Sequence, residues 1–314
     1  MKFGAMAWNN RSGNPRLMVE ELRATAHLAE ATGYDSLWVS DHPMPARKLE
    51  SKYPYSRTGE FQLRQFIDPL LTLAMLGEHT NRIKLGTNII LLPLRHPLML
   101  AKMISGLDVL TNGRLIIGAG AGWMKEEFDF LGAASFEHRG TVMDEYLQIF
   151  KEVWTKEHPQ HKGKYYQFDN LHFEPKPLQG TVPVLIGGNS EAALRRAVRY
   201  ADGWLGLTMP FTDYLKYRDR LKALCIEYGR DFSTLTVGIA QSCVIDLNAK
   251  RDPEAEKNVA LSGHPETIAA SIRKYQAEGL QHLVVFHGMV GVQPGPKAHM
   301  TAIETFAKEV LTRV

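Results

Sequence analysis

Short apolar runs alternate along the chain with longer stretches in which apolar residues recur every three or four positions. A run rich in valine, isoleucine and leucine is typical of a buried strand, and the longer period is typical of an amphipathic helix. The strand-like runs lie at about residues 2–8, 36–42, 84–92, 114–122, 183–188, 203–209, 235–245 and 282–288. This alternation predicts βα units and a parallel sheet.

Helix starts carry recognisable signals. Asn14-Pro15 and Asp68-Pro69 each pair an N-cap residue with proline at the first helical position, and Ser190 is a further N-cap. Helical stretches follow every strand, at about residues 15–33, from 69, 97–110, up to 154, from 190, after 209, 265–278 and 297–311. Eight strand–helix units predict an α/β fold, a closed (β/α)8 TIM barrel forming one domain over residues 1–314. An open doubly wound sheet is the competing fold.

Two insertions interrupt the pattern, one after the second strand and one between the fourth and fifth. Residues 43–66 show no clear period and are expected to form a basic lid. Its charged residues are Arg47, Lys48, Lys52, Arg57 and Arg64 against Glu50 and Glu60. In residues 162–182, aromatic residues flank Asp169-Asn170, which predicts a hairpin turning there.

The composition narrows the class of protein. With 44% hydrophobic and 23% charged residues and a net charge of +3, the chain lacks the basic excess of a nucleic-acid binder. Two cysteines outside any paired motif give no disulfide framework or cysteine-based zinc site. The first residues resemble a buried strand more than a signal peptide, and no apolar run is long enough to span a membrane. We therefore expect a soluble, cytoplasmic protein.

Barrel enzymes carry their active sites at the carboxyl ends of the strands, which shortens the list of candidate residues. The polar residues at these ends are Asp41, His42, Thr87, Asn88, Asn189, Ser190, Thr208, Gln241, Ser242 and His287. No pair of strand-end carboxylates suggests a glycosidase, and no G-x-S-x-G motif suggests a serine hydrolase. His42 and His287 leave a metal-dependent hydrolase as an alternative, although no metal site is expected.

Two groups of glycines follow strands. Gly187-Gly188 precede Asn189 and the capping Ser190, so bare N–H groups at a helix start form a possible phosphate site. The alternative is a plain turn; Arg195, Arg196 and Arg199 favour the phosphate. Separately, Gly118, Gly120 and Gly122 form G-x-G-x-G, which departs from the dinucleotide-binding fingerprint. These alternating glycines are expected to clear one strand face for a flat ligand.

Three stretches together resemble the bacterial luciferase-like family of flavin and deazaflavin oxidoreductases. They are SLWVSDH, LGTNIILLPLRHPLMLAKMISGLDVLTNGRLIIGAGAGWMKEEFDFLG and VPVLIGGNSEAALRRAVRYADGWLG. The resemblance covers most of residues 1–206 and extends more loosely to the eighth strand. It is closest to the branch that uses coenzyme F420, a 5-deazaflavin, with flavin mononucleotide (FMN) as the alternative cofactor.

The resemblance implies a cofactor ring at the barrel mouth and hydride transfer to or from a mainly apolar organic substrate. It assigns His42 as the catalytic residue; the alternative is a packed histidine beside Asp41. It also implies a non-prolyl cis peptide at Asn88-Ile89. The cofactor-binding residues it implies are Asp41, His42, Thr87, Asn88, Ile89, Gly120, Ala121, Gly187, Gly188 and Asn189.

One departure from the family concerns the residue after the strand-four glycines, where some deazaflavin dehydrogenases have an acidic glutamate. Trp123 stands there, and it is expected to line an apolar substrate pocket with Met6, Trp8 and Phe286. Glu126 and Glu127 follow, and the simple expectation is that they are solvated acids in the first turn of a helix.

The resemblance also implies partners. A homodimer formed through the outer helices is expected, and an FMN-dependent monooxygenase would need a partner reductase. The basic lid could attract the polyglutamate tail of a deazaflavin, although charged surface segments are usually just solvated. A non-catalytic cofactor carrier is the remaining alternative; in that case replacing His42 would affect binding alone.

Overall fold

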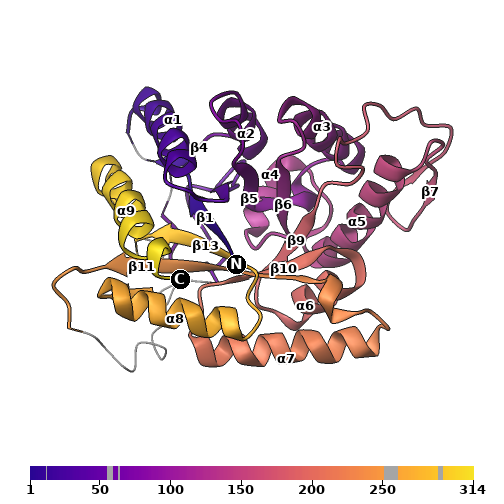
Figure 1. Ribbon diagram of the computed structural model, residues 1–314. Coiled ribbons are helices and arrows are strands. Elements are labelled where there is room, and N and C mark those ends of the chain that lie inside the picture. The colour runs from indigo at the N-terminus through magenta and orange to yellow at the C-terminus, as the bar shows by residue number, and fades with distance from the viewer. Residues whose placement is uncertain (12, 55–58, 63, 251–260, 289–292) are drawn as a thin grey trace.

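The computed structural model describes residues 1–314 except 12, 55–58, 63, 251–260 and 289–292 (Figure 1). Its centre is a closed barrel of parallel strands in which each strand pairs with the next, and the last pairs with the first. The strands are β1 (Lys2–Met6), β3 (Ser36–Val39), β5 (Lys84–Leu91), β6 (Leu115–Gly120), β9 (Val184–Gly187), β10 (Gly203–Leu207), β11 (Thr236–Ile245) and β13 (His282–His287). The predicted TIM barrel is confirmed, and the open sheet is excluded.

Helices surround the barrel (Figure 1). They are α1 (Pro15–Ala31), α2 (Pro69–Glu78), α3 (Pro97–Leu110), α4 (Lys125–Leu131), α5 (Arg139–Thr155), α6 (Glu191–Tyr200), α7 (Phe211–Glu227), α8 (Pro265–Ala277) and α9 (Pro296–Glu309). The predicted caps are confirmed, because the side chains of Asn14, Asp68 and Ser190 accept hydrogen bonds from first-turn N–H groups. The long helical region before residue 154 is divided, since Gly132 takes a left-handed conformation and ends α4.

The hydrophobic core has two layers. One lies between the barrel and the helices, and the other fills the barrel. The buried residues inside the barrel are Met6, Trp38, Leu185, Leu205, Ala240 and Val284. Trp38 is the largest, and Gly4 and Gly86 make room for it, because a β-carbon at either position would collide with its indole ring.

The insertions are attached at definite points. The last part of the lid forms β4 (Gln65–Phe66), which pairs antiparallel with β2 (Asn10–Arg11) beyond β1. Arg57 of the predicted lid lies outside the described residues. The short β12 (Leu261–Gly263) adds to β11 outside the barrel. Within the described ranges, no helix is both long and apolar enough to cross a membrane.

The hairpin between the fourth and fifth barrel strands forms earlier than predicted. It pairs β7 (His161–Lys162) with β8 (Gln167–Phe168), so the chain turns at residues 163–166 rather than at Asp169-Asn170. The carboxylate of Glu145 on α5 explains the difference, because it accepts hydrogen bonds from the backbone N–H groups of Tyr165 and Tyr166. A buried carboxylate from a distant helix thus outweighs the local turn signal.

Candidate active site

His42 lies just beyond β3 at the barrel mouth and has a carboxylate partner. Its Nδ1 lies 2.9 Å from Oε2 of Glu127, whose other oxygen accepts from the backbone N–H of Met44 at 3.1 Å. Glu127 is in the first turn of α4 and is fully buried. The expectation that it is a solvated acid is therefore wrong. Because the carboxylate accepts from Nδ1–H, the neutral imidazole carries its lone pair on Nε2.

Aromatic rings surround the imidazole. The ring centroids of Phe61, Phe66 and Trp123 lie 4.7, 5.3 and 5.7 Å from that of His42. Tyr53 packs on Trp123 at 5.1 Å. We call these four residues the aromatic cage. The side chain of His42 keeps 11% of its surface exposed, and Nε2 has no hydrogen-bond partner among the residues that the structure describes. A ligand that reaches Nε2 has to meet the cage.

Glu126, the neighbour of Glu127, holds another part of the lid. Its Oε1 accepts from the N–H groups of Glu50 and Ser51 at 2.6 and 3.0 Å. Burial raises the pKa of this carboxyl, but the hydrogen bonds from Ser51 and its neighbours prevail and lower it to about 2. Glu126 is therefore not a solvated acid either. Two consecutive glutamates of α4 thus bind the lid. Glu127 binds His42 and Met44, and Glu126 binds residues 50–51.

The side chain of Asp41 binds other parts of the protein. Its buried carboxylate accepts two hydrogen bonds from Arg95, at 2.7 and 2.9 Å, and one from the N–H of Leu91. Arg95 also binds Asp68 at the N-cap of α2. Burial raises the pKa of Asp41 even though Arg95 opposes the rise. The side chain thus fixes the chain beside His42, and only the main chain of Asp41 is left for a cofactor contact.

The peptide bond between Asn88 and Ile89 is cis, as predicted. The pairing of β5 with β6 shifts between Thr87 and Ile90, and Oγ1 of Thr87 donates to the carbonyl oxygen of Gly118 at 2.8 Å. The side chain of Ile89 lies over Gly118, Gly120 and Gly187, where an added β-carbon would press against it, whereas Gly122 lies against Phe128. Gly118 and Gly120 therefore admit Ile89, and the prediction that the alternating glycines leave a bare strand face is wrong at these two positions.

The turn after β9 holds the predicted phosphate glycines. Gly188 takes a φ of 109°, and the Asn189 side chain bonds both the N–H and the carbonyl of Leu207. Asn189 therefore joins two strand ends. On the other side, β6 ends at Gly120, and Ala121 follows it. The three following arginines do not face this turn: Arg195 binds Glu191 and Glu227, Arg196 binds Asp144, and Arg199 lies over aromatic rings. These arginines therefore do not favour a phosphate site, because their positions on α6 direct their side chains away from the turn.

The predicted substrate-pocket residues fall into two groups. Met6, Trp8 and Phe286 pack together inside the barrel, with Trp8 and Phe286 at 5.9 Å, whereas Trp123 belongs to the aromatic cage. Sequence reasoning gave no role to Ser242, which lies two residues beyond the inward-facing Ala240 of β11. Its Oγ is buried with no hydrogen-bond partner among the described residues. Such a group points to a ligand or a water.

His287 differs from His42. It is 1% exposed, and its Nε2 bonds the hydroxyl of Tyr34 at 2.9 Å. Burial lowers its pKa well below the usual value, with a smaller contribution from His299. Within the described ranges, no group of three histidine, cysteine or acidic side chains could hold a metal ion.

Comparison with known proteins places this geometry in context. The family model described as luciferase-like monooxygenase matches residues 1–259. An uncharacterized protein of Mycobacterium tuberculosis is 33% identical over 183 residues, which are 57% of this chain and 62% of that protein. The match thus spans less than two thirds of that relative. An F420-dependent glucose-6-phosphate dehydrogenase of Amycolatopsis mediterranei is 26% identical over 329 residues, with 92% of both chains covered.

Solved structures agree on the fold. An F420-dependent secondary alcohol dehydrogenase, in complex with an F420-acetone adduct, superposes with a TM-score of 0.77 at 18% identity, covering 100% of this chain and 99% of that one. The oxygenating constituent of 3,6-diketocamphane monooxygenase from Pseudomonas putida, in complex with FMN, gives a TM-score of 0.75 at 21% identity, covering 100% and 99%.

Proposed function

The chain belongs to the luciferase-like monooxygenase family, and on this premise we propose that it is an F420-dependent oxidoreductase that transfers a hydride to or from a mainly apolar organic substrate. The observation that carries the proposal is the His42–Glu127 pair at the barrel mouth. Two relatives named as F420-dependent glucose-6-phosphate dehydrogenases, matched over 92% and 91% of the chain, support the choice of cofactor.

The residues at the mouth fit a flat ring with a phosphate-bearing side chain. Ile89, lying over the glycines, offers an apolar surface for one ring face. The unpartnered Oγ of Ser242 suits the polar edge of such a ring. The N-terminus of α6 after Gly188 suits a phosphate, since helix N-termini attract anions. A bound deazaflavin supplies a two-electron hydride acceptor or donor.

In this proposal the chain moves the proton that accompanies the hydride. A substrate hydroxyl placed against Nε2 of His42 passes its proton there while the hydride leaves the adjoining carbon. Glu127 accepts from Nδ1–H and stabilises the imidazolium that forms. In the reverse direction Nε2–H donates the proton to the carbonyl oxygen. The aromatic cage excludes water from the imidazole, and Met6, Trp8 and Phe286 form an apolar wall for the substrate.

An FMN-dependent monooxygenase with a partner reductase is the second candidate. The similarity in fold to the FMN-bound oxygenating constituent favours it. It differs from the first candidate in the cofactor and in the consumption of oxygen.

Two titrations test the proposal. Cofactor-free protein is titrated with coenzyme F420 and, separately, with FMN. Micromolar or tighter binding of F420 alone supports the proposal, and secondary alcohols and glucose 6-phosphate are then the first substrates to assay. Preference for FMN, especially reduced FMN with oxygen uptake, moves the assignment to the monooxygenase. Binding of neither overturns both.

A homodimer is part of the proposal. Leu71 on α2 and Met99, Met103 and Leu110 on α3 are exposed apolar side chains on outer helices that pack together. Such clusters on a barrel exterior suit a self-complementary interface. Light scattering of the purified protein, compared with a Met99→Glu, Met103→Glu variant, tests it.

A further inference from the structure

We propose that the cavity between the N-termini of α1 and α9 binds the anionic end of the substrate. The inference rests on the proposed function in that it assigns the anion to the molecule that His42 acts upon. It adds a carboxylate or a similar oxyanion to the apolar body expected from the barrel interior.

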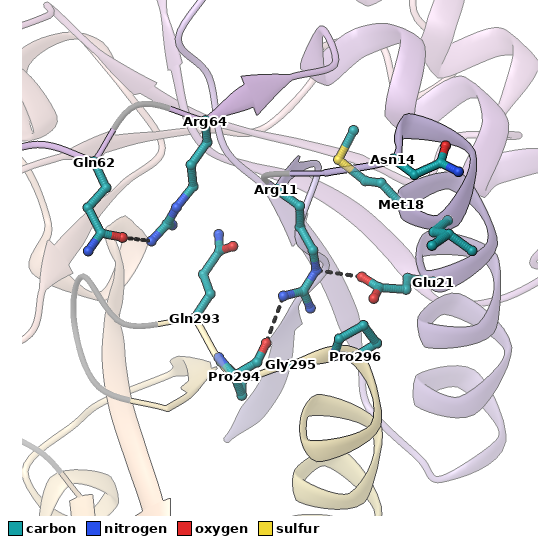
Figure 2. A pocket seen from close by; sticks show the side chains of 11 residues that line it. Arg11, Asn14, Met18, Glu21, Gln62, Arg64, Gln293, Pro294, Gly295 and Pro296 are labelled. Carbon is teal, nitrogen blue, oxygen red and sulfur yellow. Dashed lines mark hydrogen bonds and ion pairs between the residues drawn. The ribbon is translucent and has the colours of Figure 1, made fainter.

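The cavity has a volume of about 390 Å³, a size that suits a small ligand. Figure 2 shows its side chains converging from segments far apart in the sequence: Arg11 after β1, Arg64 from the lid, Gln293 before α9, and Glu21 from α1. The lining is therefore built by the lid, by α1 and by the loops beyond β1 and β13, and these loops belong to the same end of the barrel as His42.

The charges of the lining favour an anion. Two guanidinium groups face the cavity against one carboxylate, that of Glu21, which lies 2.5 Å from Nε of Arg11. The Arg11 side chain is only 12% exposed and also donates to the carbonyl of Pro294 at 2.7 Å. Burial and then the repulsion by Arg11 lower the pKa of Arg64. An anion between the two arginines would relieve this repulsion, and charge-assisted hydrogen bonds from guanidinium to carboxylate are strong.

Helix α9 adds to the positive potential. Its N-cap is Gly295, which has no side chain to cap the first-turn N–H groups. The positive end of the helix dipole thus faces the cavity beside Arg11.

Hydrogen bonds link the cavity lining to the segment that precedes His42. Gln293 donates to Oδ1 of Asn10, and Nδ2 of Asn10 donates to Oγ of Ser40 at 3.0 Å, two residues before His42. On the paired strands β2 and β4, Asn10 is opposite Phe66 of the aromatic cage. These contacts place the cavity beside the aromatic cage, and in the proposal the apolar body of the substrate lies along this ribbon toward Nε2.

The experiment uses octanoate as the probe, with octan-1-ol as its neutral match, and cofactor-free protein in a calorimetric titration. We expect octanoate to bind the wild type and the Arg11→Gln, Arg64→Gln double variant to bind it at least about ten-fold more weakly. Arg47→Gln removes an exposed lid arginine outside the cavity and should bind octanoate as the wild type does. Equal octanoate binding by all three proteins, absence of binding, or equally tight binding of octan-1-ol overturns the proposal.

Two further arms separate the remaining explanations. Arg11→Gln leaves Glu21 without its partner and can unfold the protein, so Arg64→Gln alone is measured as well, with thermal melting as the check on folding. The anion could instead belong to the cofactor tail. If Arg64→Gln weakens binding of F420 but not of its core lacking phosphate and glutamates, the tail is the occupant and the proposal is wrong. Failure of the wild type to bind either cofactor would count against the proposed function and leave the octanoate result unchanged.

Discussion

Two histidines lie at the carboxyl ends of barrel strands, and their surroundings differ. His42, beyond β3, keeps 11% of its side chain exposed and bonds a buried carboxylate. His287, at the end of β13, is 1% exposed and bonds a tyrosine hydroxyl beside Phe306 and His299. A carboxylate stabilises the imidazolium form, whereas burial against neutral groups disfavours it. The same position in the fold thus yields a histidine that has a carboxylate partner and one that burial keeps neutral.

The partner decides the difference, and it comes from a distant element. Glu127 reaches His42 from α4, 85 residues along the chain. A strand-end histidine is therefore a candidate for proton transfer only when a carboxylate orients it and its second nitrogen remains accessible.

The largest expected effect follows from removing His42. His42→Ala should lower kcat for hydride transfer by roughly 10²–10⁴, because general acid–base catalysis contributes about this much. The matched control is His287→Gln, which should leave kcat close to the wild-type value while lowering the melting temperature. Stopped-flow reduction of F420 measures the first effect. A loss confined to cofactor affinity in His42→Ala would identify the protein as a cofactor carrier instead.

A smaller effect is expected from Glu127→Gln. The amide cannot stabilise an imidazolium, so kcat should fall by about 10- to 100-fold, the range seen when groups that orient a functional histidine are removed. The downfield Nδ1–H proton resonance of His42 should shift or vanish, which reports the altered hydrogen bond. A fall in kcat with little change in KM and in melting temperature would separate positioning from a purely structural role. Asp129→Asn, an exposed acid on the same helix, is the control. An unchanged resonance and unchanged kcat would contradict the positioning role.

The sequence was informative wherever local patterns determine structure. The eight strands, the N-caps at Asn14, Asp68 and Ser190, and the insertion after the second strand follow from periodicity and cap chemistry. The cis bond at Asn88-Ile89 came from family resemblance alone. The strands and the caps depend on a few consecutive residues, and this is why a single chain revealed them.

Features that depend on distant contacts escaped prediction. Nothing local distinguishes Glu127 from a solvated acid, since its burial depends on the lid folding over α4. Gly118 and Gly120 pointed to open space, yet the side chain of Ile89 from the neighbouring strand packs against both. The hairpin turn was displaced by Glu145 of α5. Each case needs a pairing across the fold that no window of sequence contains.

Low pH should lower the stability of the protein through its buried, neutral histidines. Burial lowers the pKa of His299 to about 4, with Arg11 adding to the shift, and burial likewise lowers that of His282 to about 4. Both bind fewer protons in the folded protein than in the unfolded chain, so their neutral burial is fully compatible with folding above about pH 6.5 and becomes destabilising as the pH falls toward 4.

Between about pH 7 and pH 5, the free energy of unfolding should fall by about 2 kcal/mol for each of these two histidines. Urea denaturation at the two pH values measures the fall in the free energy of unfolding. His299→Gln should make this fall smaller by the contribution of one histidine, about 2 kcal/mol. His42 is partly exposed and has a carboxylate partner. His42→Ala should therefore leave the contributions of His299 and His282 to this fall unchanged. A pH dependence unaffected by His299→Gln would mean that this histidine has the same pKa in the folded and unfolded protein, so its burial would not keep it neutral.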